Sequence, residues 1–395
     1  MSIRKRTWKT AKGLEKQAWI VDYVDQAGAR HIKTFDRKKE ADAFQAQAKV
    51  EVRAGVHTPD SVSLTVSEAA ALWLESCRGR GLERSTVDAY ARHVRFHIVP
   101  FIGAVKLSQV SAPLVRDLED RLRRGDDGAP PRSAPMIRKI LTSLASLIED
   151  ARERGLVAVN AARQMRAGRK RGTEAQAHKR QKGKLKVGVD VPTRAEVKAI
   201  VDGLHDRWRP ILLTLIFSGL RSSELRGLRW RDIDLKKGVI HVRQRVDQYM
   251  QFGPPKSAAG ERAVPMPPIV ANALREWKLV CQKGDLDLAF PTANGRPIGH
   301  TDLAVYGWQR AQIEAGVTDS SGNKARYPGL HAARHFFASW LINSRKDGGL
   351  GLSAKAAQVR LGHASVSMTM DVYGHWFPNP DEHSELAAAE KELLG

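Results

Sequence analysis

The sequence Gly-Leu-His-Ala-Ala-Arg-His at residues 329–335 places polar side chains at the start of an apolar segment, and a second apolar segment follows with His363 and Tyr373. His331 and Arg334 are three residues apart, so they share one face if this segment is a helix. An arginine fork beside an imidazole is suited to holding a phosphate oxygen. A phosphate site here also requires that the fold bring His363 and Tyr373 to the same point.

The composition of the chain bounds its size class and its partner. A chain of 395 residues predicts two or three domains, and a hydrophobic share of 42% is sufficient for packed cores. Its 65 Lys and Arg residues outnumber its 43 Asp and Glu residues, which gives a formal net charge of +22. This excess favours a polyanionic partner, nucleic acid first, and disfavours a small-molecule enzyme, although a generally basic protein has the same composition.

The cysteines and the apolar runs indicate the compartment. Cys77 and Cys281 are far apart and form no Cys-x-x-Cys pair, so the sequence predicts neither a disulfide framework nor a cysteine zinc site. The longest apolar run, residues 211–217, is too short to span a bilayer, and the basic N-terminus lacks the apolar core of a signal peptide. We therefore expect a cytoplasmic protein without a membrane segment.

Residues 1–58 predict a small sheet backed by one helix. Two strand-like runs, 19–23 and 31–35, flank a turn at Gly28, and an Ala-, Glu- and Lys-rich helical pattern begins at Lys38. The basic strands are suited to a DNA groove, but a solvated basic face is an equally good interpretation.

Residues 65–165 predict an all-helical unit. The capping box Thr-Val-Ser-Glu at 65–68 begins its first helix, and helical patterns follow at 86–97, 113–123 and 135–154. The basic side chains of this unit suit a phosphate backbone more than a protein interface. They are Arg84, Arg92, Arg95, Arg116, Arg121, Arg123, Arg124, Arg132, Arg138 and Lys139.

Residues 166–190 are predicted to be a basic linker. Nine Lys or Arg residues and a single acid, Glu174, lie between positions 166 and 186, with no apolar period. The charge can follow DNA between two domains, or it can merely keep the segment extended.

Residues 191–395 predict a third domain, mixed α/β but mostly helical. A second capping box, Thr-Arg-Ala-Glu at 193–196, begins it, and strands are predicted at 238–243 and 262–266. The loop 318–329 has no role that the sequence explains.

Six residues, taken in order, resemble the catalytic set of the tyrosine recombinases, the phage-integrase family of site-specific DNA recombinases: Arg221, Lys256, His331, Arg334, His363 and Tyr373. The motifs that carry the resemblance are Gly-Leu-Arg-Ser-Ser-Glu-Leu at 219–225, Pro-Pro-Lys-Ser at 254–257, Leu-His-Ala-Ala-Arg-His at 330–335, and Leu-Gly-His at 361–363 with Tyr373 ten residues later. The resemblance covers about residues 191–380. The helical unit looks like the family's core-site-binding domain, and the N-terminal part looks like the three-stranded arm-site-binding domain of many integrases.

The chemistry of strand transfer accounts for these residue types. Arg221 and Arg334 offer forked donors that stay charged beside the nonbridging oxygens of a phosphodiester. Tyr373 is protonated at neutral pH, since a free phenol has a pKa of about 10, and needs neighbouring cations and a base such as His331 in order to attack. The resemblance implies that Lys256 gives a proton to the leaving 5′ oxygen, and His363 can hydrogen-bond a phosphate oxygen.

Some residues of these motifs have simpler interpretations. We expect Glu224 to be a buried partner that orients Arg221, and His335 to be structural. His331 and His335 are spaced as a metal pair, but the sequence has neither the glutamate of His-Glu-x-x-His nor a third ligand at a suitable spacing. It also lacks a Walker loop and a carboxylate pair for two Mg²⁺ ions, so we expect no cofactor and no metal.

The resemblance also implies partners and a setting. It implies double-stranded DNA with core and arm attachment sites, a homotetramer on that DNA, and accessory DNA-bending proteins in a bacterial host, near the nucleoid. Residues 384–394 have helical apolar spacing and are a candidate for docking on a neighbouring protomer. Two alternatives remain: a type IB-like DNA-relaxing enzyme with the same chemistry, and a non-catalytic DNA-binding regulator.

Overall fold

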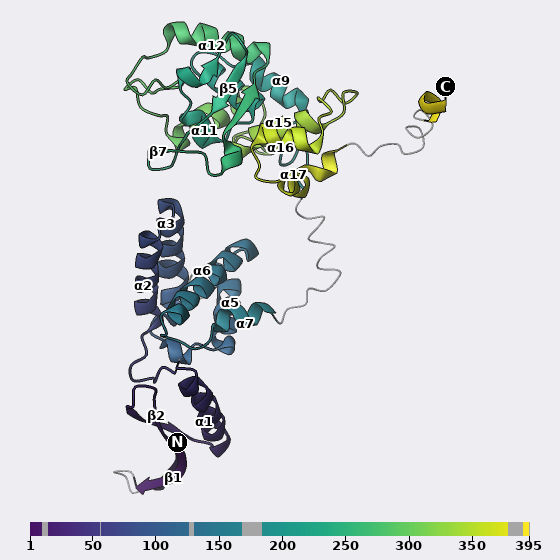
Figure 1. Cartoon of the computed structure of the whole chain (residues 1–395). Helices are drawn as coiled ribbons and strands as arrows, with labels where there is room; N and C mark the ends of the chain where they lie inside the picture. Colours follow the sequence, from purple (N-terminus) through teal and green to yellow (C-terminus); the bar gives the residue numbers. More distant parts are fainter. Residues whose placement is uncertain (10–14, 56, 126–129, 168–183, 378–389, 395) are drawn as a thin grey trace. The chain divides into compact units, whose positions relative to one another are not determined.

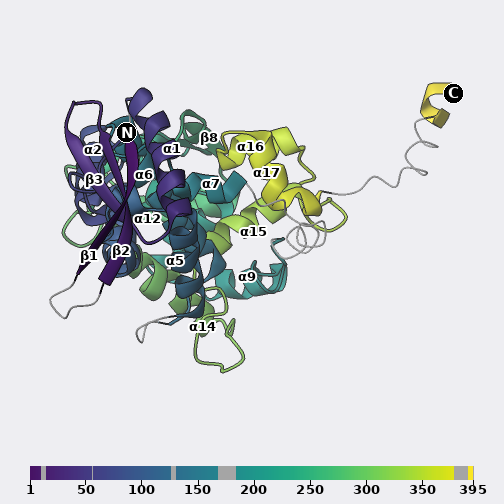
Figure 2. The same cartoon turned by 90° about the horizontal axis from the view of Figure 1, so that it is seen from below.

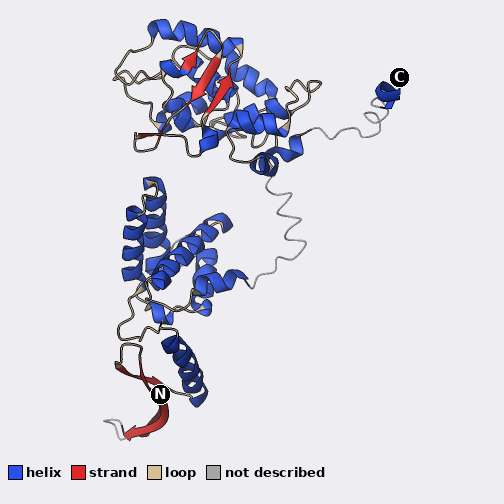
Figure 3. Ribbon diagram, viewed as in Figure 1, coloured by secondary structure: helices blue, strands red, loops and turns tan. Residues whose placement is uncertain are grey.

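The computed structural model describes residues 1–9, 15–55, 57–125, 130–167, 184–377 and 390–394 (Figure 1). The chain divides into two compact units, Met1–Gly172 and Thr173–Gly395. Helices dominate both units, and the described strands form only small antiparallel sheets (Figure 3). The predicted fold class, mainly helical with an N-terminal three-stranded sheet, is confirmed. Most of the predicted linker and of the docking segment 384–394 lies outside the described residues.

A three-stranded antiparallel sheet in the order β1-β2-β3 opens the first unit (Figure 2). β1 is Ser2–Lys9, β2 is Glu15–Val24 and β3 is Arg30–Phe35, and the helix α1, Lys38–Arg53, packs on one face. Val21 and Tyr23 of β2 bury against Ala41 of α1. Because side chains alternate along a strand, the residues between them belong to the opposite face of the sheet.

Helices around the buried Trp73 make up the rest of the first unit. The side chain of Thr65 accepts a hydrogen bond from the Glu68 backbone, and the Glu68 carboxylate accepts one from the Thr65 backbone, so the predicted capping box is confirmed. The helix predicted at 86–97 continues as a π-helical turn after His93. The elements are α2 Val66–Gly79, α3 Arg84–His93, η1 Val94–Ile98, α4 Val99–Ile102, η2 Leu107–Gln109, α5 Ala112–Arg124, α6 Ala134–Glu153 and α7 Ala161–Ala167.

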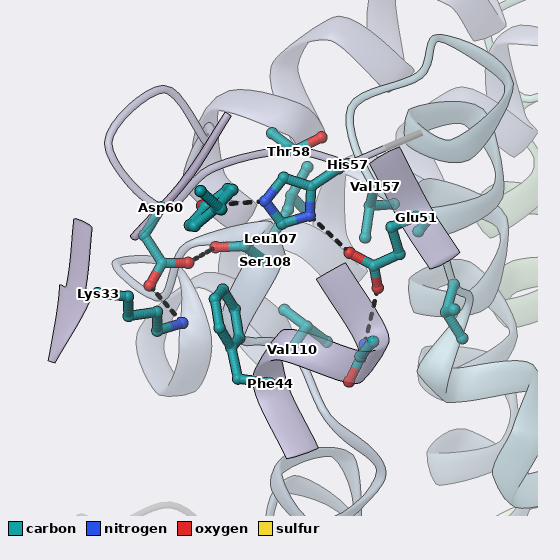
Figure 4. A pocket seen from close by; sticks show the side chains of 14 residues that line it. Lys33, Phe44, Glu51, His57, Thr58, Asp60, Leu107, Ser108, Val110 and Val157 are labelled. Carbon is teal, nitrogen blue, oxygen red and sulfur yellow. Dashed lines mark hydrogen bonds and ion pairs between the residues drawn. The ribbon is translucent and has the colours of Figure 1, made fainter. Parts of the chain in front are cut away.

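A polar cavity lies between the sheet module, which consists of β1–β3 and α1, and the helices that follow it in the first unit (Figure 4). Lys33 of β3 pairs with Asp60 at 2.8 Å, and Asp60 accepts a hydrogen bond of 2.6 Å from Ser108. On the other side of the cavity, His57 is joined to Glu51 at 2.8 Å and to the hydroxyl of Tyr23 at 3.0 Å. Polar contacts therefore tie the sheet module to the helical part.

The second unit is built around the helix α10, Trp208–Ser218, whose residues 210–216 and Ser218 are buried. The predicted capping box of Thr193 and Glu196 is confirmed at the start of α9. The two predicted strands pair with each other as β5 and β8. The sequence between them forms a separate, smaller hairpin of β6 and β7. The helices are α9 Arg194–Asp202, α10, α11 Ser222–Arg226, η3 Trp230–Asp232, η4 Ala258–Gly260, α12 Pro268–Val280, α13 His300–Asp302, η5 Leu303–Gln309, α14 Arg310–Glu314, α15 His331–Ile342, α16 Ala354–Leu361, α17 Val366–Tyr373 and η6 Gly374–Trp376. The strands are β4 Ile233–Asp234, β5 Val239–Val242, β6 Arg245–Val246, β7 Phe252–Gly253 and β8 Arg262–Pro265.

The loop 318–329, unexplained by the sequence, anchors the start of α9 and leads into α15. Its Arg326 pairs with Glu196 at 3.1 Å, and the Tyr327 hydroxyl donates to the same carboxylate at 2.9 Å. The Tyr327 carbonyl accepts a bond from the buried Trp308 indole at 2.7 Å. Across the part of the chain that the structure covers, no helix combines the length and the apolar character that crossing a bilayer requires.

Candidate active site

Arg334 is the buried centre of the site. It lies on α15 and is only 2% exposed; its Nη1 donates to the Gly219 carbonyl at 2.5 Å, and its Nη2 donates to the Leu361 carbonyl. These carbonyls end the helices α10 and α16, whose negative dipole ends favour a cation. Burial, together with the charges of Arg221 and Arg262, lowers the pKa of Arg334 to about 9. The guanidinium therefore stays charged at neutral pH, with its fork held in one orientation.

Two glycines end these helices with left-handed backbone. Gly219 has φ 61° and Gly362 has φ 64°. A Cβ atom on Gly219 would lie 2.2 Å from the Phe337 ring, and one on Gly362 would lie 2.9 Å from the Ala259 carbonyl oxygen. Since both the backbone angle and the space exclude a side chain, these positions need glycine to direct their carbonyls at the site.

Replacement of Gly219 by alanine is expected to destabilise the second unit by about 2–4 kcal/mol, because left-handed strain adds to overpacking against Phe337. Gly316→Ala is the matched control: its φ is 72°, but nothing lies within 4 Å of the added Cβ. The control should cost only the strain, about 1–2 kcal/mol. Denaturant unfolding of the full chain measures both, and equal losses would contradict the role assigned to Phe337.

Arg221 is held beside the same helix end by a buried carboxylate. Its Nη1 donates to Glu224 at 2.7 Å and its Nη2 to the Gly362 carbonyl at 3.2 Å, while 26% of its side chain stays exposed. Arg262, from β8, donates to the same Glu224 at 2.9 Å. Burial alone would raise the pKa of Glu224, but Arg262 and Arg221 outweigh it and the pKa is lowered. Glu224 is thus the buried partner of Arg221 that the sequence predicted.

Glu224→Gln is expected to destabilise the second unit by about 3–5 kcal/mol, because two cations would lose their shared buried counter-charge. The exposed pair Arg310–Glu314, joined at 2.7 Å, provides the control. Glu314→Gln should cost less than about 1 kcal/mol. The free energy of unfolding of the full chain distinguishes them, and a small loss for Glu224→Gln would show that the carboxylate does not hold this cluster together.

Tyr373 ends α17 with its ring enclosed and 2% exposed. Its hydroxyl lies 2.8 Å from Nδ1 of His335. The ring stacks with His363, at 6.1 Å between centroids and 10° between planes, and with Trp376, at 5.3 Å and 22°. Burial raises the pKa of Tyr373 to about 12, although the nearby arginines act in the opposite direction. The hydroxyl is therefore protonated in the free chain.

The two predicted site histidines are kept neutral by their surroundings. His363 is buried, its Nδ1 lies 2.9 Å from the Thr369 hydroxyl, and burial together with Arg334 and Arg221 lowers its pKa to about 4. His331 begins α15 at the exposed edge of the site, where desolvation of its ring and the same two arginines lower its pKa. Neutral imidazoles can both donate and accept hydrogen bonds, so each suits contact with a phosphate oxygen.

Lys256 is exposed on the segment between β7 and η4. The segment continues to Ala259, which approaches Gly362, and then to Arg262. The structure therefore gathers five of the six predicted residues around the ends of α10 and α16, and places Lys256 on the adjoining surface loop.

Three residues of this cluster were not predicted as site residues from the sequence: His335, Arg262 and Trp376. His335 had a signal, since it follows Arg334 directly and lies one turn after His331 on the same helix. Arg262 and Trp376 had none, because only tertiary packing brings them to Glu224 and Tyr373. Among the described residues, no group of three or more His, Cys, Asp or Glu side chains is arranged to hold a metal ion.

Comparisons with known proteins identify relatives of this chain. Residues 191–379 match the model of the phage integrase family. The chain is 29% identical to the tyrosine recombinase XerC of Xylella fastidiosa strain M23, over 75% of this chain and 87% of that protein. It is 23% identical to the integrase of Mycobacterium phage D29, over 100% of this chain and 99% of that protein.

Other similarities cover less sequence or only the fold. Prophage integrase IntR of Escherichia coli strain K12 is 26% identical over 215 residues, and the chain spans 49% of its length. A solved structure of the Tn1549 transposon integrase in complex with a circular intermediate DNA has a TM-score of 0.62, with 21% identity over 84% of this chain and 100% of that chain. At this identity, the likeness concerns the fold.

Proposed function

Because the chain belongs to the phage integrase family of tyrosine recombinases, we propose that it cleaves and rejoins DNA strands at specific sites through a 3′-phosphotyrosine formed on Tyr373. The observation that carries the proposal is the convergence of the two arginine forks on the helix end beside this tyrosine. Arg334 and Arg221 bond the adjacent carbonyls of Leu361 and Gly362, and the ring of His363 stacks on Tyr373.

In this mechanism the two arginines bind the nonbridging oxygens of the scissile phosphate. They stabilise the charge that grows when Tyr373 attacks, and their fixed orientation avoids reorganisation during the reaction. His331 and His363 donate or accept hydrogen bonds at the same oxygens. Lys256, on its surface loop, gives a proton to the departing 5′ oxygen. The phosphotyrosine conserves the energy of the broken bond, so religation needs neither ATP nor metal.

The buried position of Tyr373 adds one step to the mechanism. With a pKa of about 12 and an enclosed ring, its hydroxyl does not attack in the free chain. DNA binding has to expose the hydroxyl to the phosphate while the arginines remain in place.

The first unit supplies the DNA contacts of the proposal. The sheet face opposite α1 carries Arg4 and Arg6, which pair in register with Ile20 and Ala18 of β2, and an exposed Trp8. A basic sheet face of this kind suits arm sites, and the arginine-bearing helices suit core sites. Both remain proposals, as do the DNA-following role of residues 166–190 and accessory DNA-bending proteins.

A complete recombination requires two sites and exchange of both strands, so we propose a homotetramer on DNA as the active assembly. The substrate is then an attachment site of a phage, prophage or other mobile element. The enzyme would work on the host chromosome, in the cytoplasm beside the nucleoid.

A nicked duplex that loses its short 5′-hydroxyl fragment after cleavage tests the proposal, because it traps the covalent adduct. We expect the full chain to form a DNA adduct stable to denaturation, and a non-catalytic regulator would form none. Two duplexes carrying attachment sites, incubated together, should also yield recombinant joints. Adduct formation with relaxation but without joints would favour the DNA-relaxing alternative.

A further inference from the structure

His335 touches the oxygen of the proposed nucleophile. Its Nδ1 lies 2.8 Å from the Tyr373 hydroxyl. It lies on α15 one residue after Arg334 and one turn after His331, so the helix fixes its imidazole relative to the proposed phosphate fork. The His331 ring meets the His335 ring edge to face, with 5.2 Å between centroids. The imidazole in contact with the phenolic oxygen is thus His335, whereas the sequence suggested His331 as the base.

Both members of the His335–Tyr373 pair are neutral at neutral pH. Burial, together with His331 and Arg334, lowers the pKa of His335 to about 4, and burial raises the pKa of Tyr373 to about 12. A neutral imidazole has one N–H donor and one acceptor nitrogen. When the ring carries its proton on Nε2, Nδ1 accepts the phenolic hydrogen and leaves the lone pairs of the oxygen for attack.

We propose that His335 is a catalytic residue, which receives the proton of Tyr373 during cleavage and returns it during religation. In cleavage, the O–H bond of Tyr373 breaks and its proton moves to the lone pair of Nδ1. The phenolic oxygen bonds to phosphorus, and the bond from phosphorus to the 5′ oxygen breaks. That oxygen takes a proton from Lys256, and religation reverses each transfer. The assignment rests on the proposed role of Tyr373 as nucleophile.

The proton moves together with the attack, not before it. In the free chain the phenol holds its proton far more tightly than this imidazole does. As the bond to phosphorus forms, the phenolic oxygen becomes more acidic. The negative charge added by the phosphate also offsets the charge of Arg334, which depresses the basicity of His335. A neutral, buried imidazole is therefore an acceptor that becomes effective only when DNA is in the site.

The test measures the rate of covalent adduct formation on the nicked duplex, with the full chain in excess. His335→Ala should react about 10²–10⁴-fold more slowly. His335→Asn, whose amide oxygen can still accept a hydrogen bond, should lose less. His205→Ala, which changes an exposed histidine of the same unit, should react like wild type. Binding to the duplex, measured by fluorescence anisotropy, should be similar in all four proteins.

Two further readouts separate proton transfer from a merely structural role. Fluorinated tyrosine at position 373 has a more acidic phenol, so it should accelerate His335→Asn more than it accelerates the wild type. A duplex with a sulfur at the bridging 5′ position has a leaving group that needs no proton. It should rescue Lys256→Ala but not His335→Ala. If His335→Ala does not bind DNA, the rates of His335→Asn and of the proteins with fluorinated Tyr373 still show whether His335 receives the proton.

Adduct formation at the wild-type rate in both His335→Ala and His335→Asn would overturn the inference. It would also be overturned if fluorinated Tyr373 accelerated His335→Asn and the wild type equally. In either case the proposed function would stand if Tyr373→Phe forms no adduct. An adduct formed by Tyr373→Phe would instead overturn the nucleophile itself, and with it both proposals.

Discussion

Tyr373→Phe is expected to abolish covalent adduct formation on the nicked duplex, by at least about 10⁴-fold, because it removes the proposed nucleophilic hydroxyl that contacts His335. The ring should still stack with His363 and Trp376. Only the hydrogen bond to His335 is lost, which costs about 1 kcal/mol of stability. Denaturing gel electrophoresis of labelled DNA measures the adduct.

Tyr327→Phe is the matched control for the nucleophile. Tyr327 is a second buried tyrosine of the same unit, with its hydroxyl bonded to Glu196 and its pKa also raised to about 12. Loss of the Tyr327 hydroxyl should lower the free energy of unfolding about as much as Tyr373→Phe does, and it should leave adduct formation intact. Full activity of Tyr373→Phe, or complete inactivity of the control, would refute the assignment.

Arg221→Lys is expected to slow cleavage by about 10²–10³-fold while duplex binding changes little. The lysine keeps the charge, but it cannot contact Glu224, the Gly362 carbonyl and a phosphate oxygen together as the guanidinium can. Single-turnover cleavage rates at saturating enzyme measure this loss separately from binding.

Arg310→Lys controls for a general intolerance of the unit to this exchange. Arg310 is an exposed arginine, and it bonds Glu314 at 2.7 Å. The replacement should leave both cleavage and stability nearly unchanged. If Arg221→Lys also cleaves at the wild-type rate, fixed charge rather than fork geometry carries the role of Arg221.

Local sequence determined much of the architecture of this chain. The capping boxes of Thr65 and Thr193 marked the starts of α2 and α9, because a cap needs only neighbours three residues apart. The turn at Gly28 and the helix α10 also follow from local signals, a glycine between two strand-like runs and an apolar run. The order of polar residues in apolar segments identified the family and the candidate residues, and the spacing of His331 and Arg334 correctly predicted a shared helix.

Tertiary structure alone decided how these residues act on one another. Burial, which no local pattern measures, sets the protonation of Tyr373, His363 and His335. Arg262, on a distant strand, shares the carboxylate of Glu224. The contact between His335 and Tyr373 also spans 38 positions of the chain. The sequence by itself therefore determined which residues are present, and the packing of distant helix ends decided which imidazole lies against the nucleophile, because such contacts depend on the whole fold.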